Sequence, residues 1–188
     1  MAVNTKNVLV GTAQLYIAPW ATVPPALPAI TVTVWAPTWV PMGATEQGVK
    51  LTVARKTVDI MVEEQPTPAQ VTTDTMTISI TTSLAEDTIA NMKVAYGGGT
   101  ITAVAPSVTK TGTTTLTLAL GLDKLTVAFQ GVNAHGFTRR FYIPEVLSVA
   151  SVDTSYRRAA AARLYPVKLR AICTPSDVMV VDKTAVKT

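Results

Sequence analysis

The sequence contains very few of the residues from which catalytic and metal sites are usually built. Its 188 residues include one histidine, His135, and one cysteine, Cys173. One of each cannot supply the ligands of a zinc site, and an internal disulfide needs a second cysteine. We expect His135, which precedes Gly136, to lie in a turn, and Cys173 to be a small buried hydrophobic side chain. No nucleophile, base and orienting group can be nominated together, so we expect neither an enzyme nor a cofactor.

Charged residues are also scarce, and a membrane does not explain why. They make up 15% of the chain, against 48% hydrophobic residues, whereas the surface of a small soluble domain usually carries about 25–35% charged residues. No charged residue occurs between Lys6 and Glu46, but prolines interrupt this stretch repeatedly, and a spanning helix needs about 20 unbroken apolar residues. The N-terminus also lacks the pattern of a signal peptide. We therefore expect protein, most simply further copies of the chain, to cover the apolar surface.

The charge that is present is uneven along the chain. Residues 1–137 hold seven Lys/Arg and eight Asp/Glu, whereas residues 138–170 hold seven and two. This basic region could bind phosphates, or it could meet an acidic edge of a neighbouring copy. Few aromatic residues accompany its arginines, unlike in a nucleic-acid stacking platform. We therefore favour salt bridges between subunits over specific nucleic-acid recognition.

Tryptophans add to the expected inter-subunit surface. All three lie in the Pro-rich segment 20–41, and a solvated loop would not carry them, so we expect them to pack against the domain or a neighbour. The residues predicted to contact other subunits are Trp20, Trp35, Trp39, Arg139, Arg140, Arg157, Arg158 and Arg163.

The composition predicts an all-β domain with one helix. Thr and Val are frequent, aromatic residues are 6%, and short alternating stretches are separated by Pro and Gly. The helix is predicted over about residues 83–96, with Ser83 and Glu86 as a capping box and three glycines at 97–99 as its stop. Residues Ala85, Ile89, Met92 and Tyr96 would face the core. We expect one domain over residues 1–174 and a peripheral tail over residues 175–188.

The stretch 43–65, "GATEQGVKLTVARKTVDIMVEEQ", alternates apolar and polar residues but changes phase at Arg55-Lys56. Successive side chains of a strand point to opposite faces, so the apolar set is odd-numbered before this point and even-numbered after it. A two-residue turn at Arg55-Lys56 would produce this change, and so would a bulge in one long strand. The apolar set expected to pack on the core is Val49, Leu51, Val53, Val58, Ile60 and Val62.

Read in order, the sequence resembles the tail tube (major tail) proteins of long-tailed bacteriophages from about Gly11 to Cys173. The first strand "GTAQLYIAP" is followed by a Pro-rich loop, and Trp39 and Gly43 then lead to the run Glu46-Gln47-Gly48-Val49. The Thr-rich strand in "TMTISITTSLAEDTIANMKVAYGGG" runs directly into the helix. The late basic strands "RRFYIPEVL" and "RLYPVKLRAI" complete the likeness, which rests on the order and spacing of these elements together.

This resemblance implies an antiparallel β-sandwich or partly open barrel with one flanking α-helix. It also implies a virion protein, made in the bacterial host cytoplasm, that forms hexameric rings stacked into a hollow tube. DNA would pass through without specific binding, and a tail terminator, a tape measure and a tail-tip protein would be partners. The face opposite the apolar set of 43–65 would line the lumen. The expected lumen-lining residues are Lys50, Thr52, Asp59, Met61, Glu63, Thr77, Ser79 and Thr81.

Other classes of protein can be distinguished from a tail tube protein. A head-tail connector or decoration protein of similar fold would form a fixed ring or a monomer and would not polymerise. A nucleic-acid-binding module would show salt-dependent affinity for DNA that weakens when Arg157 and Arg158 are substituted. A secreted adhesive sandwich is disfavoured because the sequence offers neither a signal peptide nor disulfides.

Overall fold

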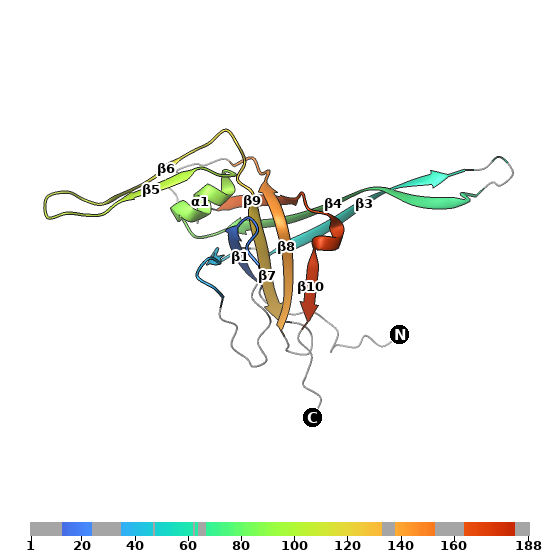
Figure 1. Cartoon of the computed structure of the whole chain (residues 1–188), viewed down its shortest axis with the longest axis horizontal. Helices are drawn as coiled ribbons and strands as arrows, with labels where there is room; N and C mark the ends of the chain where they lie inside the picture. The colour runs from blue at the N-terminus through green and yellow to red at the C-terminus, as the bar shows by residue number, and fades with distance from the viewer. Residues whose placement is uncertain are drawn as a thin grey trace, which may run out of the picture.

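The computed structural model describes residues 13–23, 35–46, 48–61, 63, 67–132, 138–152 and 164–182. Within these ranges the chain is almost entirely antiparallel β-structure with one short α-helix, as Figure 1 shows. The elements are β1 (Gln14–Pro19), β2 (Val40–Pro41), β3 (Lys50–Ile60), β4 (Gln70–Leu84), α1 (Ile89–Ala95), β5 (Thr100–Val104), β6 (Thr113–Thr117), β7 (Leu125–Val132), β8 (Thr138–Ser148), β9 (Tyr165–Ala171), a 3₁₀ turn (Pro175–Asp177) and β10 (Met179–Asp182).

Eight of the strands form one open sheet. Its order is β2-β1-β7-β8-β9-β4-β3, with β10 paired to β8, and β5 and β6 form a separate two-stranded sheet. In Figure 1, β7 and β8 run steeply across the direction of β3 and β4, so the sheet twists strongly between its two ends. The predicted all-β fold with one flanking helix is confirmed, and the sheet is not closed into a barrel.

The hydrophobic core lies on one face of this sheet and is covered by α1. The strands alternate there as expected: in β9, Tyr165, Val167 and Leu169 are buried while Lys168 and Arg170 are exposed. Strands β1, β4, β7, β8 and β9 all contribute side chains to it. The fully buried side chains include Leu15, Ile80, Leu84, Val127, Ile143, Val146, Tyr165, Val167 and Leu169.

The helix is shorter than predicted, and its start is different. It begins after Thr88, whose hydroxyl accepts a hydrogen bond from the Asn91 backbone N–H at 3.1 Å, so Thr88 is the N-cap. The predicted capping box is wrong because Ser83 still belongs to β4 and Glu86 is used elsewhere. The Glu86 carboxylate accepts from the backbone N–H of Ala44 at 2.9 Å, which fastens the segment before β3 to the start of the helix.

The predicted glycine stop is confirmed, whereas the predicted core stripe is not. Gly97 has φ of +86°, and its N–H donates to Val94 O at 3.2 Å while the Gly98 N–H donates to Lys93 O at 3.0 Å. These two bonds form a Schellman motif. The buried helix residues are Asn91, Val94 and Ala95. The stripe expected at Ala85, Ile89, Met92 and Tyr96 is only half-buried, because the later start leaves Ala85 outside the helix and α1 is turned so that Asn91, Val94 and Ala95 lie deepest. Met92 still packs against the core.

Part of the tail expected after residue 174 is paired with the body. Residues 179–182 form β10 and pair with residues 139–142 of β8, for example Val180 with Phe141. The physical reason lies in β8, since its pairs with β9 begin only at Val146 and leave its first half with an open edge. Strand β10 occupies that edge.

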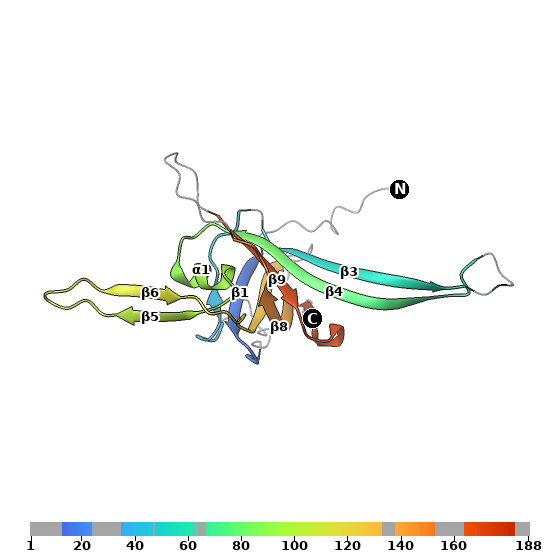
Figure 2. The same ribbon diagram turned by 90° about the horizontal axis from the view of Figure 1, so that it is seen from above.

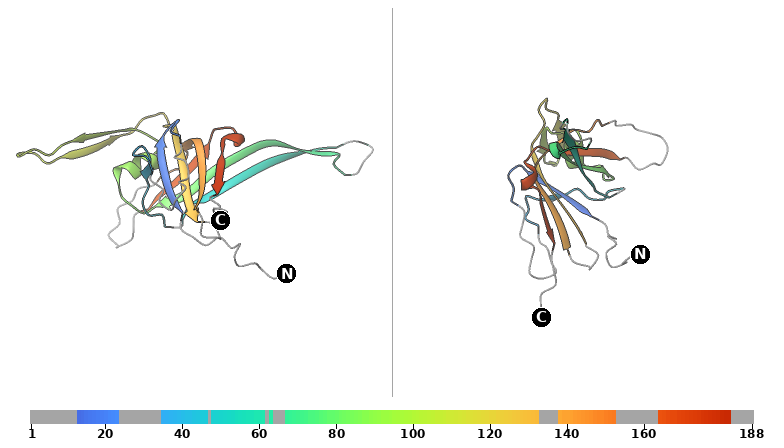
Figure 3. Two further views of the ribbon diagram at one scale, coloured as in Figure 1. Left: turned by 60° about the horizontal axis from the view of Figure 1, so that its bottom comes forward. Right: turned by 90° about the vertical axis from the view of Figure 1, so that its right-hand side faces the viewer.

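Two hairpins project from the body as arms, which Figures 2 and 3 show leaving on opposite sides. The longer arm is the distal part of β3 and β4, and the shorter arm is β5 with β6. Strand β3 passes through Arg55 and Lys56 without a turn, so the two-residue turn is excluded for this segment. The irregularity lies between Lys56 and Thr57, where β3 advances by one residue and β4 by two, from Thr75 to Thr73. The additional residue therefore belongs to β4, so the bulge is not in β3 itself.

Much of the apolar face predicted for β3 is not part of the core. Val49 and Leu51 are half-buried and pack against it, as expected. Val53, Val58 and Ile60 are exposed, because the body ends near Leu51 and only β4 continues alongside. Val62 lies outside the described residues.

Candidate functional site

A polar face runs along β3 and β4 opposite the core. Strand register pairs Lys50 with Thr81 and Thr52 with Ser79, and Thr77 follows opposite Ala54. Side chains of directly paired residues lie on the same face of a sheet. The opposite face here holds Ile78 and Ile80 in the core. Five of the eight predicted lumen-lining residues are therefore brought together on one surface: Lys50, Thr52, Thr77, Ser79 and Thr81.

Strand β9 extends this face with two cations that the sequence analysis did not include. Arg170 pairs with Ser79 and Lys168 with Thr81, and both side chains are exposed. The alternation of Tyr165, Val167 and Leu169 with these cations was visible in the sequence. What was missing was the information that β9 lies beside β4. The polar face, as we call the surface of Lys50, Thr52, Thr77, Ser79, Thr81, Lys168 and Arg170, is thus rich in hydroxyls and basic.

The other three predicted lumen-lining residues lie apart from the polar face. Asp59 pairs with Val71 beyond the bulge, and by simple alternation along β3 it shares the face of Leu51 and Val53. Met61 and Glu63 are exposed beyond the end of β3, at the far end of the long arm. The side chains of Lys50 and Asp59, both predicted to line the lumen, therefore point to opposite faces of the ribbon.

Two of the tryptophans predicted to contact other subunits cover the second face of β1, β7 and β8 instead. Trp39 is 3% exposed and packs with Tyr16, Ala18, Ala128 and Tyr142, and Trp35 lies against this cluster. The ring of Trp35 stacks on Tyr16 with centroids 4.0 Å apart. Trp39 is therefore unavailable for contact with a neighbour in this conformation. Trp20, by contrast, is 55% exposed and keeps its predicted role open.

Arg140 belongs to the same aromatic cluster. It is 3% exposed, its guanidinium lies 4.3 Å from the centre of the Trp35 ring, and it donates to Gln130 Oε1 at 3.0 Å. Burial lowers the pKa of Arg140, and the neighbouring Tyr16 partly opposes this effect. Burial also raises the pKa of Tyr16, so the phenol stays protonated. Arg140 thus acts within the subunit, while Arg139 beside it is half-buried. Arg157, Arg158 and Arg163, and also His135, lie outside the described residues.

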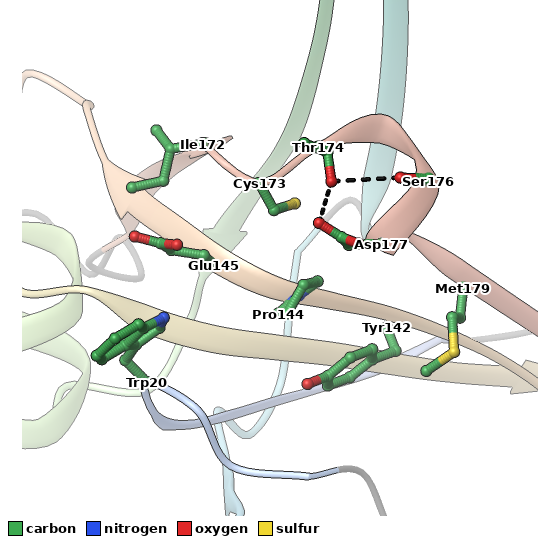
Figure 4. A pocket seen from close by; sticks show the side chains of 10 residues that line it. All are labelled: Trp20, Tyr142, Pro144, Glu145, Ile172, Cys173, Thr174, Ser176, Asp177 and Met179. Carbon is green, nitrogen blue, oxygen red and sulfur yellow. Dashed lines mark hydrogen bonds between the residues drawn. The ribbon is translucent and has the colours of Figure 1, made fainter.

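A cleft of about 660 Å³ opens between β8 and the turn before β10 (Figure 4). It contains Cys173, whose pKa is raised by burial, so its thiol is less ready to form a thiolate. The carboxylates are engaged: Glu145 pairs with Lys124 at 2.5 Å, and Asp177 accepts the hydroxyl of Thr174. The side chains that line the cleft therefore offer packing and hydrogen bonding, and Cys173 has no activating base among them.

The described ranges offer neither a metal-binding cluster nor a membrane-spanning helix. Within them, His, Cys, Asp and Glu side chains nowhere gather in threes in a way that could hold a metal ion. None of the helices described has the length and apolar character needed to cross a membrane.

Comparison with known proteins identifies a family. A search among curated proteins finds nothing similar. A family model described as "Phage tail tube protein" matches residues 1–175, which is most of the chain and includes every element from β1 to β9. The chain therefore belongs to the phage tail tube protein family.

Proposed function

We propose that this protein assembles into hexameric rings that stack into the hollow tail tube through which the phage genome passes. Membership of a structural tail tube family supports a non-enzymatic component of the virion tail. The observation that carries the finer proposal is the polar face of β3, β4 and β9, whose opposite side is the core. A subunit that turns one face of its sheet to a bore and buries the opposite face needs a sheet with one polar and one apolar face.

The polar face would line the bore. Strands lie about 4.8 Å apart and tilt by roughly 40° in barrels. If β8, the next strand beside β9, joins β3, β4 and β9 in each of six copies, about 24 strands give a backbone diameter near 48 Å, wide enough for duplex DNA. A single subunit's sheet could not enclose such a channel. We restrict the lining to the seven residues of the polar face, because Asp59 points away from it and Met61 and Glu63 lie at the end of the arm.

The chemistry of this lining suits transit. Threonine and serine hydroxyls offer weak, exchangeable hydrogen bonds, whereas phosphates are held mainly by many simultaneous contacts with Lys and Arg. Lys50, Lys168 and Arg170 add positive charge in three places, so DNA would slide along a wall whose attraction falls with rising salt. As in the family, a tail terminator, a tape measure and tail-tip proteins would complete the tail.

Electron microscopy of the purified protein over a concentration series, with and without tails as seeds, tests the proposal. Hollow tubes or stacked rings with a bore as wide as DNA are the expected result. Monomers or single closed rings under both conditions would refute tube formation and favour a connector or decoration protein.

A further inference from the structure

The cleft between β8 and the turn before β10 combines aromatic rings with oxygen-bearing side chains. Figure 4 shows Trp20 and Tyr142 along one side of it, and Thr174, Ser176 and Asp177 along the other. Its volume of about 660 Å³ falls within the range of about 300–1,000 Å³ that is typical of ligand pockets. The cleft is therefore large enough for a small organic ligand.

Trp20 is held at this cleft although much of its ring is exposed. The residue is 55% exposed, which is unusual for a side chain of this size. Lys124 Nζ lies 5.0 Å from the centre of the Trp20 ring and also pairs with the Glu145 carboxylate, so one cation braces both side chains. A large aromatic ring that is fixed and exposed beside a cleft is typical of a binding surface.

The backbone next to Trp20 is strained. Among the described residues, Ala21 is the one residue other than glycine with a positive φ, at +66°. The turn is closed by the N–H and the hydroxyl of Thr22, which donate to Pro19 O at 3.2 and 2.6 Å. The Tyr142 hydroxyl in turn donates to Thr22 O at 3.2 Å and ties this turn to β8. A turn position with positive φ normally carries glycine, and strain of this kind concentrates at functional sites.

Membership of the family does not account for this cleft. The family model matches residues 1–175, whereas Ser176, Asp177 and Met179 follow the matched region. Part of the cleft is therefore built by a segment that lies outside the match. The ligand has to be identified from the chemistry of the lining itself.

The polar groups of the lining favour a neutral ligand with several hydroxyl groups. Two carboxylates, Glu145 and Asp177, disfavour an anion. A cation is disfavoured because Glu145 already pairs with Lys124 at 2.5 Å. Asp177 accepts the hydroxyl of Thr174, but an ionised carboxylate offers about four acceptor sites, so both carboxylates can still accept hydrogen bonds from ligand hydroxyls. The negative face of an aromatic ring, for its part, attracts C–H groups.

We infer that this cleft binds a neutral sugar ring, whose C–H face stacks on Trp20 and whose hydroxyls donate to Asp177 and Glu145. A sugar ring has both features that the lining requires, an apolar face and a rim of hydroxyl groups. Because the ligand is small and the cleft is open, the dissociation constant should be in the millimolar range. Such a site adds ligand binding to the tube-forming role proposed above.

Saturation-transfer NMR on the dilute full-length protein tests the site. The probes are the methyl glycosides of glucose, galactose, mannose, N-acetylglucosamine and rhamnose. Glycerol is the ligand control, because it carries hydroxyls but no ring. We expect transfer to the ring C–H protons of at least one glycoside and none to glycerol. No transfer to any of the glycosides, or equal transfer to glycerol, would refute the inference.

Variants with matched controls assign the binding to this cleft. Trp20→Ala should weaken it at least about tenfold because the stacking ring is lost, and Asp177→Asn at least about threefold because a charged acceptor is lost. The controls are Leu120→Ala and Glu46→Gln, which make comparable changes at exposed residues outside the cleft and should bind within about twofold of the wild type. Circular dichroism checks that each variant is folded. Equal weakening in the controls would contradict the assignment.

A comparison of dilute subunits with assembled tubes separates this site from a contact between copies. Binding that persists in tubes supports a sugar site on the virion. Binding by dilute subunits that disappears in tubes would show that a neighbouring copy covers Trp20, and would refute such a site. If the protein binds a glycoside but never forms tubes, the proposed function fails while the sugar site stands.

Discussion

The exposed position of Ile60 makes a prediction opposite to what its alternating sequence suggests. Ile60 is 46% exposed on the long arm, whereas Ile80, at an equivalent place in the alternation of β4, is 0% exposed in the core. Replacing Ile60 by Lys adds charge at a site with no buried neighbours to lose, so we expect a change in the free energy of unfolding within about 0.5 kcal/mol. Ile80→Ala removes buried carbons and should cost about 3 kcal/mol.

Thermal unfolding of dilute, monomeric protein distinguishes the two variants. In a domain of this size each kcal/mol shifts Tm by about 2–4 °C, so Ile80→Ala should lower Tm by about 6–12 °C and Ile60→Lys by less than about 2 °C. Far-ultraviolet circular dichroism is a suitable probe of the unfolding of such a β-protein. A loss of stability for Ile60→Lys equal to that of Ile80→Ala would show that the arm packs on its own body, and would refute the argument from exposure.

Three further predictions concern the helix ends and the buried titratable groups. Thr88→Ala should lower stability by about 1 kcal/mol because it removes the N-cap, while Ser83→Ala should not show that loss, as equilibrium denaturation can measure. Gly97→Ala should cost about 1–2 kcal/mol, because φ is +86° and a Cβ would lie 2.7 Å from Leu122, whereas the control Gly121→Ala meets nothing within 4 Å and should be near neutral in the same assay. Burial raises the pKa of Tyr16, Tyr142 and Cys173, so the unfolded chain loses these protons at lower pH than the folded one. Stability should be intact below about pH 8, begin to fall near the pKa of a free cysteine at about 8.5, and fall further as the pH rises through about 10, where free tyrosine titrates. Denaturation from pH 8 to 11 would measure this fall, which Tyr142→Phe should make shallower; a flat profile would contradict it.

Local signals in the sequence identified several elements correctly. The glycines at 97–99 predicted the helix stop, because a Schellman motif needs a residue that tolerates positive φ. The capping residue was mistaken because Ser83 and Thr88 are both acceptable caps, and only the pairing of β4 with β9 up to Leu84 keeps Ser83 in a strand. The polar side chains of β3 and β4 were assigned to one face from their alternation, and the register confirms that Lys50 and Thr52 face the same way as Ser79 and Thr81.

The sequence by itself determined the fold class, the family and the two faces of the β3–β4 hairpin near the body, because alternation, turn residues and the order of elements are local or linear properties; beyond Lys56 it assigned the faces of β3 wrongly, since the additional residue lies in β4. Tertiary structure alone decided which faces are covered. Val53 and Ile60 look like Ile78 and Ile80 in the sequence, but the body reaches only the inner end of the β3–β4 hairpin, so the first pair is exposed and the second buried. It likewise placed Lys168 and Arg170 beside the hydroxyls of β4, and Trp39 over its own sheet. Burial depends on which distant segments become neighbours, and a one-dimensional pattern does not contain that information.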